Sequence, residues 1–365
     1  MGSQATPEEE TRLRLDDGSS SSLPGAPGSV QKGGAVATAA GDGAGGTSKQ
    51  RLTNAEVRRT VVESLAVCGF YISVSSAMVF SNKALSYTFH FTTTNVLLLL
   101  QMIFTALLLR FLRDVAHVIE FDDFVRAKAM RIAPVSLFYS LNAAVALLAL
   151  RELSVPSYTL IKRLAPLFTI GLEYALLQRR ATRSVLLSLF IMVGGTVLAA
   201  RSDSTSATSS WMLGLTSCVF QALYLTYVKR SGVETGFSAY GVLYYHSILS
   251  VPMLVVLGGL MGEFPIAMAY PLWLKPSFLI VFSASLFMGF LLNYSLFLCT
   301  ERTSPTSTVV SGQVKAMGQT AVGMFTFGGV DMNARYTAGT LLNIVGGIGY
   351  AYSKYRLILD SAGSR

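Results

Sequence analysis

The sequence predicts an all-α polytopic membrane protein with ten transmembrane helices, arranged as two inverted five-helix repeats. The first observation is composition: 52% of the 365 residues are hydrophobic and only 13% are charged, whereas a soluble domain carries about 25% charged residues. The second is a series of apolar runs, each long enough for the roughly 20 helical residues that cross a hydrocarbon core. Because these runs are continuous rather than alternating, helices are expected rather than a β-barrel. The third is an internal repeat.

The two ends of the chain differ from these apolar runs. Residues 1–55 are rich in Gly, Ser and Ala and contain the acidic groups Glu8-Glu9-Glu10 and Asp16-Asp17, a composition that cannot bury a core. They lack the apolar region of a signal peptide, and their acidic residues argue against a plastid or mitochondrial transit peptide. We therefore expect a disordered cytosolic leader over 1–55 and a cytosolic tail over 357–365.

The connections between the apolar runs predict the topology. Basic residues such as Arg113, Arg126 and Arg179 gather in alternate connections, so the positive-inside rule places both termini in the cytosol and requires an even number of helices. We expect the first repeat over 56–203 and the second over 204–356. The expected helices cover residues 61–82, 92–112, 132–150, 156–177, 184–200, 211–229, 238–261, 277–299, 305–327 and 337–355.

The internal repeat is seen when the chain is compared with itself. An offset of 149 residues aligns Glu152 with Glu301 and Pro156 with Pro305, within a recurring Glu-x-x-x-Pro-[Ser/Thr]-x-Thr block. The offset carries the third helix onto the eighth, so each repeat holds five helices. Since five is odd, the two copies cross the membrane in opposite directions. Inverted repeats of this kind are typical of secondary transporters, with a site near the midplane at the repeat interface.

Several functional classes are disfavoured. The net charge of +9 follows the topology rather than a patch with interleaved aromatic residues, so no nucleic-acid partner is expected. No Walker motif or nucleophile–base pair is present, and the His residues lack metal-ligand spacing. We therefore expect no cofactor, no metal and no enzymatic activity. Three isolated cysteines, each within an apolar run, are interpreted as packing residues without a disulfide framework: Cys68, Cys218 and Cys299.

Three cations lie inside predicted helices. Lys162 and Arg163 lie about two turns into the fourth helix, and Lys315 about three turns into the ninth, the corresponding helix of the other repeat. Charges within membrane spans are costly and usually face a cavity. With Glu173 the only obvious nearby acid, the positive excess favours an anion, and phosphate oxygens would supply both charge and acceptors. The alternative is that Lys162 or Arg163 reaches an interface, or pairs with Glu173 or Glu152.

Polar residues near these cations are candidates for lining the base and sugar ends of such a ligand. Gly312 would allow close approach of a backbone or ligand. The alternative for each polar residue is interhelical hydrogen bonding, and for Asn293 alone that is the favoured interpretation. The candidates are Tyr244, Tyr245 and His246 in the seventh helix, Asn293 in the eighth, and Ser311, Gly312 and Gln313 in the ninth.

With these residues identified, the chain resembles the nucleotide-sugar transporters of solute carrier family 35, within the drug/metabolite transporter superfamily, over residues 60–356. The resemblance implies ten helices, a Golgi or ER membrane, and exchange of a cytosolic nucleotide sugar for lumenal nucleoside monophosphate. Expected partners are these two solutes and the lipid bilayer, and a homodimer is compatible with the family. The resemblance is carried by Ser81-Asn82-Lys83, Thr94-Asn95, Val155 to Arg163, Gly241 to Tyr245, Thr308 to Lys315 and Gly349 to Lys354.

The resemblance also bears on the substrate. GDP-mannose carriers have a Phe-Tyr-Asn-Asn motif where this chain has Tyr244-Tyr245-His246-Ser247, and a Gly-Ala-Leu-Asn-Lys motif where it has Ser311-Gly312-Gln313-Val314-Lys315. The final lysine is kept, which suits a diphosphate ligand, whereas the asparagines that read guanine are replaced. This favours exchange of UDP-N-acetylhexosamine or UDP-glucuronate for UMP. The alternatives are a GDP-mannose or GDP-fucose/GMP antiporter, a plastid phosphate-ester translocator and a non-transporting scaffold.

Overall fold

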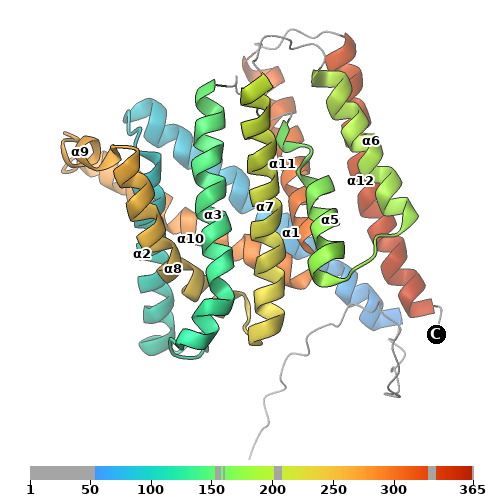
Figure 1. The fold of residues 1–365 in the computed structure, drawn as a ribbon, viewed down its shortest axis with the longest axis horizontal. Helices are drawn as coiled ribbons and strands as arrows, with labels where there is room; N and C mark the ends of the chain where they lie inside the picture. Colours follow the sequence, from blue (N-terminus) through green and yellow to red (C-terminus); the bar gives the residue numbers. More distant parts are fainter. Residues whose placement is uncertain (1–53, 153–157, 159–160, 201–207, 328–333, 364–365) are drawn as a thin grey trace, which may run out of the picture. The chain divides into compact units, whose positions relative to one another are not determined.

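The computed structural model describes residues 54–152, 158, 161–200, 208–327 and 334–363, and every regular element among them is helical. These helices belong to one unit of the chain, Ala39–Arg365. Figure 1 shows how they lie side by side. In chain order they are α1 (Asn54–Lys83), the π-helical turn η1 (Ala84–Thr88), α2 (Thr94–Asp114), α3 (Arg126–Glu152), α5 (Ala165–Leu177), α6 (Arg183–Ala200), α7 (Thr208–Thr235), α8 (Ala239–Leu260), α9 (Glu263–Met268), α10 (Pro276–Arg302), α11 (Pro305–Phe327) and α12 (Ala334–Gly363).

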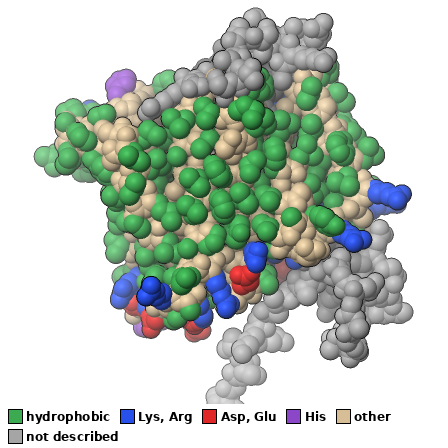
Figure 2. Space-filling model, in the orientation of Figure 1, with side chains coloured by type: hydrophobic (Ala, Val, Ile, Leu, Met, Phe, Trp, Pro, Cys, Tyr) green, Lys and Arg blue, Asp and Glu red, His purple; other side chains and the backbone are tan. Residues whose placement is uncertain are grey.

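The surface is that of a membrane protein. Within the described ranges, six helices are long and apolar enough to cross a bilayer, and two shorter apolar helices accompany them, Ala165–Leu177 and Arg183–Leu198. Hydrophobic side chains cover most of the face in Figure 2, whereas Lys, Arg, Asp and Glu gather at its lower edge. Because a lipid-facing surface has no need of polar groups, this band confirms the prediction of a multi-pass membrane protein. The ten crossings and the inverted repeats stay predictions.

The fourth predicted helix, 156–177, is wrong as a continuous element. Its described part has helical residues at 161–162, a turn at 163–164, and a new helix from Ala165. The Leu164 amide donates to the Ile161 carbonyl at 2.9 Å, a bond three residues back rather than four. Pro166, in the first turn of α5, explains the break, because proline has no amide hydrogen to donate to the Lys162 carbonyl four residues back and its ring crowds that carbonyl. Residues 153–157 and 159–160 lie outside the described residues.

Other boundaries differ at the basic ends of helices. The third helix begins at Arg126 rather than residue 132, since helical hydrogen bonding continues beyond the apolar part into the basic turn. Two short elements were not predicted: η1, and the six-residue helix α9 between α8 and α10. The cysteines are also less isolated than predicted. All three are free, but the Sγ atoms of Cys68 on α1 and Cys299 on α10 lie 3.6 Å apart.

Helices of the first predicted repeat contact helices of the second throughout the unit. The pairs α2 with α8, α3 with α7, α1 with α10, α5 with α11, and α6 with α12 are all in contact. The α6–α12 pair is especially close. A Cβ atom added to Gly195 would lie 2.5 Å from the Gly339 oxygen, and one added to Gly346 would lie 2.5 Å from Met192 Cγ. Glycine is therefore required at both positions for these helices to approach.

Candidate functional site

Lys162 lies at the helix break before α5 and points towards α3 and α7. Its Nζ donates to Asn142 Oδ1 at 3.1 Å, to the Ser217 carbonyl at 3.3 Å and to Gln221 Oε1 at 3.0 Å. The ammonium also lies 5.5 Å from the centroid of the Tyr158 ring. All three acceptors are neutral and the side chain is half-buried. The positive charge of Lys162 is therefore held in place by hydrogen bonds but not neutralised by them.

Lys315 lies on α11 and reaches towards α1. Its Nζ donates to Ser75 Oγ at 2.7 Å, and the side chain is half-buried while Ser75 is buried. One turn earlier, a Cβ atom added to Gly312 would lie 3.4 Å from the Tyr71 hydroxyl. A side chain at position 312 would thus fill the space beside this hydroxyl, which the glycine leaves open.

Gln313 joins α11 to the helix break that carries Lys162. Its Nε2 donates to the main-chain oxygen of Lys162 at 2.9 Å. The break at 163–164 interrupts the regular pattern of helical hydrogen bonds, and Gln313 supplies a donor to this carbonyl. The neighbouring Ser311 hydroxyl donates to the Ser307 carbonyl of its own helix at 2.9 Å. The structure therefore brings Lys162, Gln313 and the α11 backbone together.

No carboxylate balances these two lysines in the described part of the chain. The ion pairs found there join residues at helix ends and in connections, and none includes Lys162 or Lys315. Glu173, the acid that sequence reasoning placed nearby, accepts a hydrogen bond from the Thr306 amide at 2.6 Å. Arg163 is fully buried at 1% exposure. The side chain of Glu152, the other acid considered, lies outside the described residues.

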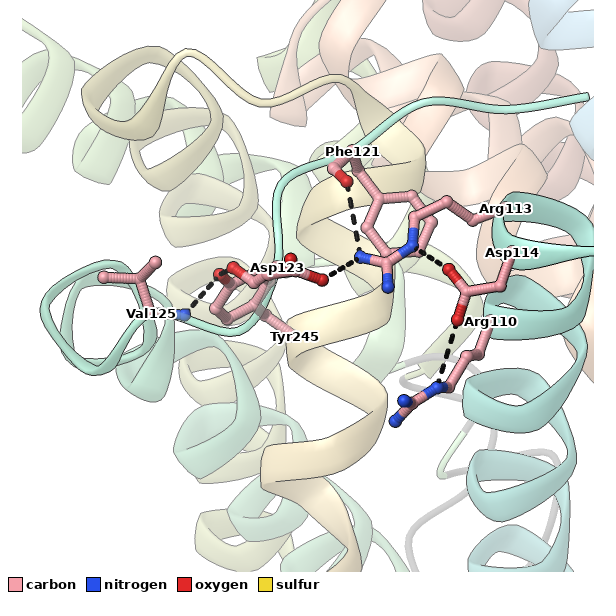
Figure 3. Close-up of polar contacts among 7 residues, drawn as sticks. All are labelled: Arg110, Arg113, Asp114, Phe121, Asp123, Val125 and Tyr245. Atoms are coloured by element: carbon pink, nitrogen blue, oxygen red, sulfur yellow. Dashed lines mark hydrogen bonds and ion pairs between the residues drawn. The ribbon is translucent and has the colours of Figure 1, made fainter. Parts of the chain in front are cut away.

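The two tyrosines of the seventh predicted helix, α8, contact the connection between α2 and α3, and Figure 3 shows the contact of Tyr245. The Tyr245 hydroxyl donates to the Asp123 carbonyl at 2.6 Å and accepts from the Val125 amide at 2.8 Å. The Tyr244 ring lies 4.6 Å from that of Phe121. Both tyrosines are buried, so in this conformation they hold the connection rather than stand beside the lysines.

The same connection is tied to the end of α2 by charged groups (Figure 3). Arg113 pairs with Asp114 at 2.6 Å and with Asp123 at 2.9 Å, and its guanidinium lies 4.9 Å from the centroid of the Phe121 ring. Arg110 pairs with the second Asp114 oxygen at 3.3 Å. Cations and carboxylates thus alternate across this surface, in contrast to the unbalanced lysines of the interior.

His246 and Asn293 lie in buried helix packing. His246 is fully buried, its Nδ1 lies 3.0 Å from Ser136 Oγ, and its ring packs edge-on against Tyr139 at 5.0 Å. Asn293 Nδ2 donates to the Gly289 carbonyl of its own helix at 3.0 Å. Sequence reasoning did not select Ser75 or Gln221, the groups that hold the lysines. Gln221 could have been found as a polar residue within an apolar run.

Comparisons with known proteins identify the family of the chain. The model of the Triose-phosphate Transporter family matches residues 49–351. The chain is 37% identical to UDP-galactose/UDP-glucose transporter 7 of Arabidopsis thaliana, over 83% of this chain and 93% of that protein. It is 29% identical to the UDP-N-acetylglucosamine transporter UGNT1 of the same plant, over 78% and 86% of the two chains. A crystal structure at 12% identity shares the fold, with a TM-score of 0.56 over 79% of this chain and 96% of that one.

Proposed function

Because this chain belongs to the nucleotide-sugar transporters of the Triose-phosphate Transporter family, we propose that it exchanges a cytosolic UDP-sugar for lumenal UMP. The family and the relatives are transporters rather than enzymes. The proposed cargo is a UDP-N-acetylhexosamine or UDP-glucuronate, and the proposed membrane is that of the Golgi or ER.

One observation carries the proposal: two half-buried lysines lie in the interior with only neutral hydrogen-bond partners in the described part of the chain. A diphosphate would supply the missing negative charge together with several acceptor oxygens. The helix α5 begins at Ala165, after the two-residue turn that follows Lys162, and the partial positive charge of a helix start adds to the attraction. Interrupted helices of this kind bind anionic groups in other secondary transporters.

The proposed transport mechanism is alternating access by two inverted five-helix repeats. The contacts between helices support it. In a two-fold arrangement the corresponding helices would be α1 and α7, α2 and α8, α3 and α10, α5 and α11, and α6 and α12. The contacts of α3 with α7 and of α1 with α10 are then equivalent, and the other three pairs join helices to their own counterparts. Exchanging the conformations of the two repeats would open the site to the opposite side.

The proposed binding site is centred on Lys162 and Lys315, with Ser311, Gly312 and Gln313 beside them. Its uridine preference is supported by the two relatives, whose names are those of UDP-sugar transporters. Tyr244, Tyr245 and His246 would act from the surrounding packing, and Arg163 and Asn293 stay predictions. The proposed topology has both termini in the cytosol, and the charged edge in Figure 2 would then face the cytosol.

The deciding experiment is solute exchange by the full chain in proteoliposomes. Vesicles preloaded with UMP should take up at least one UDP-sugar from a panel, and unloaded vesicles should not. If GMP rather than UMP drives uptake, the cargo is a GDP-sugar and the uridine assignment is wrong. If preloaded inorganic phosphate supports uptake of a phosphate ester instead, the chain is a phosphate-ester translocator. No exchange under any loading would contradict the proposal as a whole.

A further inference from the structure

Charged side chains from several elements surround the turn between α10 and α11. The ammonium of Lys229, on α7, donates a hydrogen bond to the main-chain oxygen of Glu301. On the other side of the turn, the Ser307 hydroxyl lies 3.1 Å from the Tyr350 hydroxyl of α12, and the Lys354 ammonium lies 5.9 Å from the centroid of that tyrosine ring. We call the following residues the turn cluster: Glu173, Arg179, Lys229, Glu301, Arg302 and Lys354.

Both carboxylates of the turn cluster are used by helix starts. Glu173 Oε1 accepts the Thr306 amide in the first turn of α11 at 2.6 Å, and Glu301 Oε2 accepts the Ala239 amide at the start of α8 at 2.7 Å. The first amides of a helix have no partner within it and favour a carboxylate. Among the described residues, neither carboxylate forms an ion pair with a cation.

The four cations of the turn cluster therefore outnumber two carboxylates that are already engaged. Lys229 interacts electrostatically with Arg179 and Arg302 as well as with Glu301 and Glu173. Lys354 interacts with Glu173 and with Arg179. The Arg179 amide is fixed by the Glu173 carbonyl at 3.3 Å. Four cations and two carboxylates leave the turn cluster with two positive charges in excess. Because like charges repel one another, this excess is unfavourable.

Topology alone does not account for this convergence. Cations that only mark the cytosolic side can stay apart in water, as do the exposed Arg58 and Arg126. In the turn cluster Arg179, Lys229 and Lys354 are half-buried and come from the α5–α6 connection, α7 and α12. An anion placed among them would relieve their mutual repulsion.

We propose that Arg179, Lys229, Arg302 and Lys354 form a second anion-binding site, which takes a phosphate-bearing anion. Guanidinium and ammonium groups are the donors that bind phosphate oxygens best. At 1.5 Å per residue, Thr306 and Lys315 lie about 14 Å apart along α11, so this site is separate from the central one. The phosphate is that of a nucleotide cargo or of a phosphorylated lipid headgroup. The proposal does not depend on transport, since binding can be measured alone.

The test uses the full chain in phosphatidylcholine discs, with inorganic pyrophosphate as the probe and calorimetric titration as the readout. The starting variant is Lys315→Gln, which weakens the central site. Arg302→Gln and Lys354→Gln are then added, while Lys229 is kept because it holds the Glu301 backbone. The matched control adds Arg58→Gln and Arg126→Gln, which remove the same charge from exposed positions on the same predicted side. Thermal unfolding without pyrophosphate checks that each variant folds, and the exposed Arg302→Gln alone replaces any pair that does not.

We expect Lys315→Gln to retain pyrophosphate binding, and the turn-cluster pair to weaken that binding about tenfold or more, because each lost charged hydrogen bond contributes a comparable factor. The control pair should change it by less than about threefold, as expected for screened surface charges. Equal weakening by both pairs would show that only the net positive charge attracts pyrophosphate, and it would overturn the proposal.

A second arm identifies the source of the phosphate. Discs that contain phosphatidylinositol phosphate are titrated in the same way, and binding of the chain to vesicles of this lipid is measured. If the turn-cluster pair loses lipid binding but keeps pyrophosphate binding, the site takes a headgroup. If it loses pyrophosphate binding in phosphatidylcholine alone, the site takes a soluble phosphate. Unchanged binding of both probes overturns the proposal, whereas failure of UMP-driven exchange leaves it intact.

Discussion

Lys162 and Lys315 occupy corresponding predicted helices but have different surroundings. The ammonium of Lys162 donates to three neutral acceptors contributed by α3 and α7, which matches the three hydrogens that an ammonium has to donate. The ammonium of Lys315 donates to the Ser75 hydroxyl, its one hydrogen-bond partner among the described residues. One lysine is thus held firmly, and the other has donors to spare.

This difference determines which hydrogen bonds an anion could form with each lysine. At Lys315 a phosphate oxygen can accept a hydrogen directly. At Lys162 a phosphate oxygen has to replace an amide or carbonyl acceptor. The gain is then only the difference between a hydrogen bond to a charged oxygen and one to a neutral oxygen. We therefore expect the anion to depend more on Lys315 than on Lys162, although both carry the same charge.

The largest expected effect is that of Lys315→Ala. Truncating one partner of a buried charge pair costs enough to lower exchange about 100-fold or more. UMP-driven uptake of a UDP-sugar by proteoliposomes measures it. Lys275→Ala is the control, because Lys275 is an exposed lysine before α10 and its loss should leave uptake unchanged. Normal exchange by the folded Lys315→Ala variant would remove this lysine from the site.

The next effect in size is that of Lys162→Ala. Because part of the binding energy at Lys162 is offset by the acceptors it gives up, we expect the KM for the UDP-sugar to rise about tenfold with a smaller change in kcat. The initial rate of uptake over a range of substrate concentrations separates the two constants. A loss of exchange as large as that of Lys315→Ala would contradict the expectation that the anion depends more on Lys315 than on Lys162.

Gln313→Met tests the link between the two lysines. Methionine keeps the length of the side chain but removes the donor to the Lys162 carbonyl. Leaving this part-buried carbonyl without its partner should lower the free energy of unfolding by about 1 kcal/mol. Thermal unfolding in detergent measures the change, and Gln178→Met, at an exposed position, is the control. An unchanged unfolding temperature would show that the carbonyl does not depend on Gln313.

The smallest expected effect is that of Ser75→Ala. Removing the Ser75 hydroxyl takes an acceptor from the Lys315 ammonium without removing its charge, so the affinity for the UDP-sugar should change by less than about threefold. Ser73→Ala, at an exposed position of the same helix, is the control. A loss comparable to that of Lys315→Ala would mean that Ser75 itself binds the cargo.

The helices and the interior position of the two lysines could be predicted from the sequence. Both follow from the cost of polar groups in lipid, which is a local property of the sequence. The break after Lys162 also had a local signal, Pro166, that the apolar run concealed. The partners of the lysines had none. Ser75 is one of many serines in the chain and lies 240 residues from Lys315, so only the packing of α1 against α11 brings them together.

The tyrosines of α8 show a second limit of sequence reasoning. A hydroxyl inside a predicted membrane helix suggested a ligand, but the Tyr245 hydroxyl bonds to main-chain groups of Asp123 and Val125. Any residue has such groups, so no side-chain pattern in the α2–α3 connection announces the contact. The polarity of α8 was recognised from the sequence, whereas the partner of Tyr245 depended on the three-dimensional course of the α2–α3 connection.

The thiols of Cys68 and Cys299 allow the relative motion of α1 and α10 to be tested by cross-linking. With their sulfur atoms 3.6 Å apart, a mild oxidant should tether the two helices in this conformation, and a reductant should release them. If exchange stops on oxidation and returns on reduction, the seam between α1 and α10 opens and closes in every transport cycle. If exchange continues in the tethered chain, the moving boundary lies elsewhere, and the two helices travel as one rigid piece.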